Sequence, residues 1–130
     1  MKIIHTSGKR KTAVARATLK EGKGMIKINN RLLNIFQPEM ARMRIQEPLM
    51  LAGNTVDKVD ISVDVNGGGF NSQAEAVRLS IAKALAQFQP NLKKTFLDYD
   101  RHLLVSDIRR KESYKPNDSK ARSKRQKSYR

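Results

Sequence analysis

The sequence predicts an α+β fold: a small sandwich in which a mixed sheet carries helices on one face, with an extended basic tail. Strand-like and helix-like stretches alternate in the order β, β, β, α, β, α, which is typical of this class. The chain has 130 residues, about one domain, but residues 109–130 lack Val, Ile, Leu, Met and Phe altogether. A segment of that composition cannot form a core by itself. We therefore expect a globular domain at residues 1–108 and a basic tail at residues 109–130.

The first part of the chain contains three short stretches with strand character, at residues 2–7, 13–20 and 25–29. The first is expected to end at Gly8 and to lead into a basic loop, Lys9-Arg10-Lys11. A glycine-containing turn, Glu21-Gly22-Lys23-Gly24, separates the second stretch from the third. We therefore expect the second and third strands to pair as a hairpin.

Two main helices are expected, and a short one over residues 91–97. The first is expected to begin at Pro38 and to end at Gly53. Proline suits the first helical position because the N–H that it lacks is not needed there. Pro48 is expected to interrupt or end its first turns. The second begins with a capping box, Ser72-Gln73-Ala74-Glu75, and apolar residues then recur at helical spacing.

A strand over residues 56–65 separates the two main helices. Apolar and polar residues alternate there, which predicts one buried and one solvated face. The following Gly67-Gly68-Gly69 lacks the Lys and the spacing of a phosphate loop. We interpret it as a tight strand-to-helix turn, with an RNA phosphate at the helix start as the alternative.

No motif supports catalysis or metal binding. There is no Cys, His5 and His102 lie far apart in sequence, and no G-x-S-x-G elbow is present. The acidic positions Asp60 and Asp64 lack the Gly and Glu of a calcium loop, so we place them on the solvated strand face. We expect no enzyme activity, no metal or cofactor and no small-molecule substrate. The methionines are interpreted as core gap-fillers rather than an adaptable binding groove: Met25, Met40, Met43 and Met50.

The charge of the chain predicts a polyanionic partner. The formal net charge is +15, and the pI of about 10.5 lies in the basic range that is typical of nucleic-acid-binding domains. The tail carries +8 of this charge and the loop around Lys9 forms a second cluster, close to Arg16. No signal segment or membrane-length apolar run is seen, so we expect a cytoplasmic protein that binds no membrane.

Three stretches together resemble one family, small-subunit ribosomal protein nine, in its archaeal and eukaryotic branch. They are Ser7-Gly-Lys-Arg-Lys-Thr-Ala-Val-Ala-Arg-Ala17, Gly67-Gly-Gly-Phe-Asn-Ser-Gln-Ala-Glu-Ala-Val-Arg78 with its continuation to Leu85, and Lys124-Arg-Gln-Lys-Ser-Tyr-Arg130. The resemblance covers essentially the whole chain, in family order and spacing.

The resemblance implies a left-handed βαβ crossover, an exception to the usual right-handed rule. It implies a structural protein in the head of the small ribosomal subunit, bound to small-subunit rRNA and to neighbouring head proteins. The tail would reach the anticodon stem-loop of the peptidyl-site tRNA, although the path of residues 116–123 stays open. The alternative is a free-standing basic protein that binds chromatin or processes RNA. The implied tRNA-binding residues are Lys127, Ser128, Tyr129 and Arg130. The implied rRNA-binding residues are Lys9, Arg10, Lys11, Arg16, Arg109, Arg110, Lys111, Lys115, Lys120, Arg122, Lys124 and Arg125.

Overall fold

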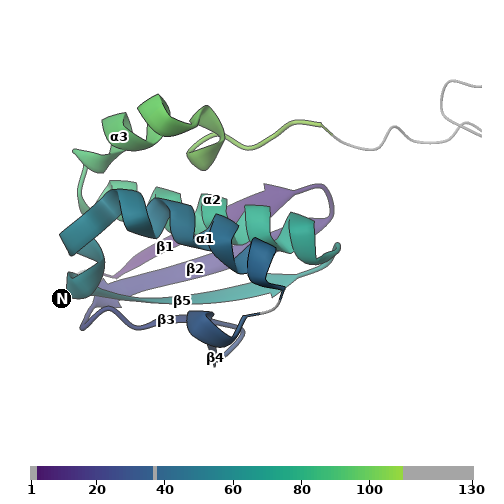
Figure 1. Cartoon of the computed structure of the whole chain (residues 1–130). Helices are drawn as coiled ribbons and strands as arrows, with labels where there is room; N and C mark the ends of the chain where they lie inside the picture. The colour runs from purple at the N-terminus through teal and green to yellow at the C-terminus, as the bar shows by residue number, and fades with distance from the viewer. Residues whose placement is uncertain (1–2, 37, 110–130) are drawn as a thin grey trace, which may run out of the picture.

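The computed structural model describes residues 3–36 and 38–109, which form a five-stranded mixed sheet with helices layered over one face (Figure 1). The α+β prediction is therefore confirmed for this part of the chain. The strands are β1 (Ile4–Arg10), β2 (Ala13–Glu21), β3 (Ile26–Ile28), β4 (Arg31–Leu32) and β5 (Val59–Asn66). The α-helices are α1 (Glu39–Ala52), α2 (Phe70–Phe88) and α3 (Leu92–Tyr99). Short 3-10 helices are η1 (Leu33–Ile35), η2 (Gly53–Lys58) and η3 (Arg101–Leu103).

The predicted basic loop is mostly strand. β1 continues through Gly8 as far as Arg10, which pairs with Ala13 of β2 in an antiparallel register. Only Lys11 and Thr12 are left for the turn, and Lys11 adopts a positive φ of 55°. The basic cluster is thus held by a rigid two-stranded ribbon.

The predicted hairpin between the second and third strands is wrong. The strand order is β1-β2-β5-β3-β4, so β5 lies between β2 and β3. The glycine turn does not close a hairpin because its backbone is bonded to the start of β5: the Gly22 N–H donates to the Lys58 carbonyl at 2.9 Å. The Asp60 carboxylate accepts the N–H groups of Lys23 and Met25, each at 3.0 Å.

The parallel pair β3 and β5 is joined through α1, which makes a βαβ unit. The hand of this crossover stays a prediction. In β5 the predicted alternation is confirmed, since Val59, Ile61, Val63 and Val65 are buried under the helices. The opposite face of the sheet carries no helix in the described part of the chain (Figure 1).

Helix α1 begins one residue later than predicted, with Pro38 as its N-cap, and ends at Gly53 as predicted. Pro48 does not interrupt it, and the helix continues to Ala52. The buried side of α1 consists of small or branched residues that recur at helical spacing, and this side packs on α2. These residues are Ala41, Ile45, Pro48 and Ala52.

The prediction that the methionines fill the core is wrong. All four are exposed, at 50% for Met25, 74% for Met40, 58% for Met43 and 79% for Met50. On α1 the cause is geometric, because the residues that pack against α2 occupy one side of the helix and the methionines another. Helix α1 has two apolar stripes, one of methionines and one that contains Ala41 and Ala52. The stripe with the smaller side chains faces α2 because it lets the two helices approach more closely.

The prediction of a capping box at the start of α2 is also wrong. The helix begins at Phe70, with Gly69 as its N-cap and no side-chain cap bond. Glu75 instead forms ion pairs with residues of other elements. The structural interpretation of the glycines is confirmed: Gly67 has a φ of +81°, and a Cβ there would lie 2.5 Å from the Thr12 carbonyl oxygen.

Candidate nucleic-acid interface

β1 and β2 form an antiparallel hairpin, and its predicted cationic residues fall into two groups according to the face that carries them. Three side chains are exposed and form no hydrogen bond or ion pair within residues 3–36 and 38–109, those of Lys9, Lys11 and Arg16. Alternation along the strands places Lys9 and Arg16 on the face away from the helices, while Lys11 lies in the turn. These three charges are available to an external anion.

The open face of the sheet contains further cations and polar groups. A shallow hollow beside Arg16 is lined by Thr12, Asn29 and Asn66, together with the carboxylate of Asp64. Hydroxyl, amide and guanidinium donors in one place suit contacts to a phosphate backbone. The negative charge of Asp64 offsets the positive charge of Arg16, so the hollow is polar rather than purely cationic.

Two lysines of the open face were missed by the sequence reasoning. Lys20 and Lys27 line a second hollow on the open face of the sheet, near Asp60. The signal was present in the sequence, because Lys20 follows Arg16 by four residues along one strand and so shares its face. Lys27 lies between buried Ile26 and Ile28, which turns its side chain to the same open side.

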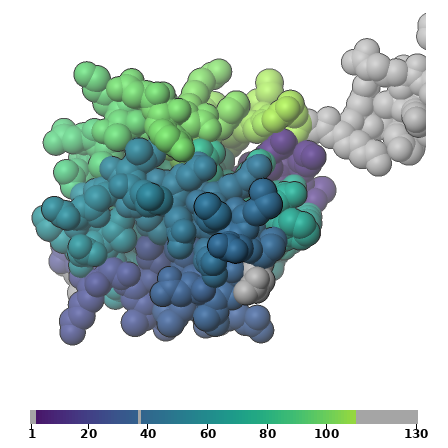
Figure 2. Space-filling model, in the orientation of Figure 1, coloured from purple at the N-terminus to yellow at the C-terminus, as the bar shows by residue number. Residues whose placement is uncertain are grey.

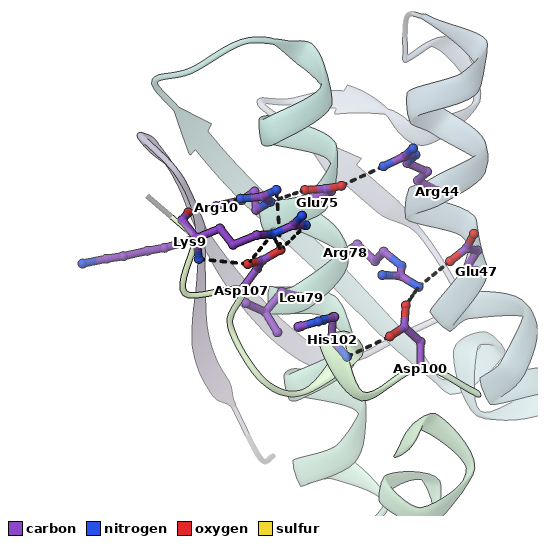
Figure 3. Close-up of a pocket in the computed structure, with 11 residues that line it drawn as sticks. Lys9, Arg10, Arg44, Glu47, Glu75, Arg78, Leu79, Asp100, His102 and Asp107 are labelled. Atoms are coloured by element: carbon purple, nitrogen blue, oxygen red, sulfur yellow. Dashed lines mark hydrogen bonds and ion pairs between the residues drawn. The ribbon is translucent and has the colours of Figure 1, made fainter. Parts of the chain in front are cut away.

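Arg10 behaves differently from its neighbours. Its side chain points toward the helices and is only 12% exposed. The Arg10 Nε donates to Glu75 Oε2 at 2.6 Å, and one guanidinium nitrogen lies 3.5 Å from the Asp107 carboxylate (Figure 3). The other oxygen of Glu75 accepts from Arg44 of α1 at 2.7 Å. Arg10 thus connects β1 to α2 and to the segment that follows α3.

A second ion-pair group lies beside the first. The Arg78 side chain is 13% exposed and contacts Glu47 at 2.6 Å and Asp100 at 3.1 Å (Figure 3). Its Nε is buried and finds no partner among the described residues. Burial opposes the charged form of Asp100, but the His102 backbone N–H and Arg78 outweigh it and lower the pKa of that carboxyl.

The base of the predicted tail is attached to this cluster. Arg109 donates to Asp107 through its side chain at 2.7 Å and through its backbone N–H at 3.0 Å, which lowers the pKa of Asp107 below its usual range. Arg10 donates to the Arg109 carbonyl at 3.4 Å. The structure therefore brings the start of the tail against the end of β1, although the two segments are 99 positions apart in the sequence.

Most of the charged side chains that line the main pocket neutralise one another. The pocket between α1, α2 and the segment after α3 is lined by cations and carboxylates that are paired with one another. Among residues 3–36 and 38–109, no group of three or more His, Asp or Glu is placed to hold a metal ion. No helix in the same residues combines the length and apolar character needed to cross a bilayer.

Most of the predicted tail contacts lie outside the described residues. Of the tail, only Arg109 is described, and it is bonded to Asp107. The remaining predicted positions are Arg110, Lys111, Lys115, Lys120, Arg122, Lys124, Arg125, Lys127, Ser128, Tyr129 and Arg130.

Comparison with known proteins supports the family resemblance. The family model described as ribosomal protein S9/S16 matches residues 8–130. The small ribosomal subunit protein uS9 of Methanococcus maripaludis strain S2 is 50% identical to the chain over 134 aligned residues, with 100% of both chains covered. The proteins of the same name from strains C7 and C5 show the same identity and coverage. The chain therefore belongs to the ribosomal protein S9/S16 family.

Proposed function

We propose that this protein is a structural component of the small ribosomal subunit, where it binds rRNA through its hairpin and open sheet face and extends its tail toward the peptidyl-site tRNA. One observation carries the rRNA part: Lys9, Lys11 and Arg16 are exposed and unpaired in the described part of the chain, whereas Arg10 is neutralised internally. A cation without an internal partner loses no ion pair when it meets a phosphate.

The placement of the tail base supports one continuous RNA-binding path. Arg10 bonds to the carbonyl of Arg109, so the tail leaves the body next to the turn at Lys11 and Thr12. Arg10 has a supporting part in this proposal, because its guanidinium joins the hairpin to the tail base rather than facing outward. Residues 109–125 would then continue along rRNA from the hairpin.

The end of the tail is the proposed tRNA contact. Residues 127–130 read Lys-Ser-Tyr-Arg, and the family resemblance supports a contact between this ending and the anticodon stem-loop. The planar fork of a terminal arginine can donate two parallel hydrogen bonds to a phosphate. Contacts of this kind position the tRNA without reading its sequence.

The rRNA contact can be tested by replacing Lys9, Lys11 and Arg16 with Ala and measuring binding to small-subunit rRNA over a range of salt concentrations. Each phosphate contact contributes roughly 0.7–0.9 to the slope of log affinity against log salt, so the slope is expected to fall by about 2–3. Fewer counterions are released when fewer phosphates are neutralised. The matched control replaces three exposed lysines elsewhere, Lys58, Lys93 and Lys94, and lowers the net charge equally.

Two results would contradict this assignment. A slope that falls by the same amount in both triple variants would show that total charge matters and the hairpin does not. Equal occupancy of the wild-type protein and the Lys9, Lys11 and Arg16 variant in purified subunits would remove the hairpin as a contact needed for incorporation.

The tail assignment has a separate test. A protein that ends at Gln126 is expected to assemble into small subunits normally, because the hairpin and the rest of the tail are intact. Such subunits should bind peptidyl-site tRNA more weakly than subunits with the full chain, and filter binding measures the difference. Equal tRNA affinity of the two subunits would refute the tRNA contact.

The cellular location can be checked with a sucrose gradient of the native protein. We expect it to sediment with small subunits in the cytoplasm. Sedimentation with DNA would instead favour a free-standing chromatin protein.

A further inference from the structure

Helix α1 presents an apolar outer surface that no other part of the described chain covers. Met40, Met43 and Met50 are 74%, 58% and 79% exposed, and their spacing of three and seven residues places them on one side of the helix. We call these three side chains the methionine face. Residues of α1 form the front surface of the molecule in the view of Figure 2. Exposed apolar side chains that gather on one element indicate an interaction site.

The methionine face has little net charge around it, although the whole chain carries +15. Arg44 donates to Glu75, and Glu47 pairs with Arg78, so these flanking charges are neutralised inside the protein. Arg42 donates to the Asn34 carbonyl at 2.9 Å and lies 3.8 Å from Glu39. An RNA phosphate would find apolar side chains here and cations that already have partners.

We propose that the methionine face docks an apolar segment of a neighbouring protein of the small ribosomal subunit. The inference rests on the proposed function, since it needs the protein to assemble into that subunit. Charge distinguishes the surface suited to RNA from the surface suited to a protein. Among the described residues, cations without partners lie on the open sheet face, whereas the exposed surface of α1 is apolar and nearly neutral. Methionine side chains are flexible and polarizable, which suits them to fill an irregular partner surface.

The methionine face rests on a rigid support. The opposite side of α1 is buried through Ala41 and Ile45, each with no exposed area, and it packs on α2. The helix is also held by the Glu47–Arg78 contact. Substitution of the exposed methionines therefore leaves the core intact, so a loss of docking can be distinguished from unfolding.

The test compares two triple variants at Met40, Met43 and Met50. Replacement by Gln keeps the length and helix propensity of the side chains but makes them polar, whereas replacement by Leu keeps them apolar. We expect the Gln variant to lose about tenfold in its apparent affinity during subunit reconstitution, because apolar area is no longer buried. The Leu variant should reconstitute within about twofold of the wild type. Equal reconstitution of the Gln variant and the wild type would overturn the inference.

The identity of the partner is tested by a photocrosslinking side chain at Met43 in assembled subunits. Crosslinks to another subunit protein support the inference, whereas crosslinks only to rRNA, or to a second copy of this chain, overturn it. The absence of any crosslink also overturns it if, in the wild-type protein, peroxide oxidises Met43 as fast in assembled subunits as in the free chain. Wild-type protein that does not enter subunits at all refutes the proposed function instead, so the two failures are distinguishable.

Discussion

Replacement of Gly8 by Ala is expected to destabilise the fold strongly, for a steric reason. Gly8 is buried in β1, opposite Ala15 of β2, where the sheet meets α2. A Cβ at this position would lie 2.5 Å from the Ala76 carbonyl oxygen and 3.0 Å from the Ser80 nitrogen. Both are backbone atoms of α2 and cannot rotate away, so the strand and the helix would have to separate.

The size of the effect follows from these distances. A carbon atom approaches a carbonyl oxygen to about 3.3 Å in normal packing, so β1 and α2 must move apart by roughly 0.8 Å. Overpacking of this kind costs about 1–3 kcal/mol, and we expect the upper end because no side chain can yield. A loss of about 3 kcal/mol lowers the melting temperature of a domain of this size by at least about 12 °C.

Gly69 supplies the matched control. It also has no positive φ, and a Cβ there would meet nothing within 4 Å. As the N-cap of α2, Gly69→Ala should cost at most about 1 kcal/mol. Urea unfolding of the full chain, followed by circular dichroism, compares the two variants at constant ionic strength. If Gly8→Ala costs no more than Gly69→Ala, the close approach of β1 and α2 does not have the energetic weight assigned to it.

Two further predictions concern charged groups. The N–H groups of Met25 and then Lys23 lower the pKa of Asp60 from 3.8, so its contribution to stability is present above pH 3.8 and is lost as the pH falls through the lowered value. Asp60→Asn should therefore flatten the dependence of the urea midpoint on pH below about pH 5, and an unchanged acid limb would contradict this. Arg78→Met should lower the free energy of unfolding in urea by about 2 kcal/mol, because the guanidinium bonds to both Glu47 and Asp100. A hydrogen bond to a charged group contributes about 1.5–3 kcal/mol, and partial solvent exposure of the two carboxylates reduces this value. A cost below about 0.5 kcal/mol would show that the ion pairs contribute little.

Local sequence patterns determined the faces of the main elements. The alternation from Val59 to Val65 identified the buried side of β5, and the glycines after it were correctly read as a tight turn. Such predictions succeed because the periods of strands and helices are local properties. The motifs around Gly8 and Gly67 identified the family, whereas the tail expected from composition stays a prediction, since residues 110–130 lie outside the described chain.

The sequence did not determine which strands are neighbours, because period alone does not select a partner. β5 lies between β2 and β3. The backbone at the start of β5 and the carboxylate of Asp60 accept the N–H groups of the glycine turn, which was expected to close a hairpin. On α1, two apolar stripes were available, and only packing against α2 decided that Ala41 and Ile45 are buried and Met43 is not.

Charge itself was visible in the sequence, but its availability was decided by tertiary structure. Lys9, Arg10 and Lys11 are adjacent in one basic run, yet within the described residues only Arg10 is neutralised, because the strand directs it toward Glu75, 65 positions away. The contact between Arg10 and the tail base depends in the same way on distant segments meeting. Composition counts charges, whereas the fold decides which of the described charges have partners within the protein.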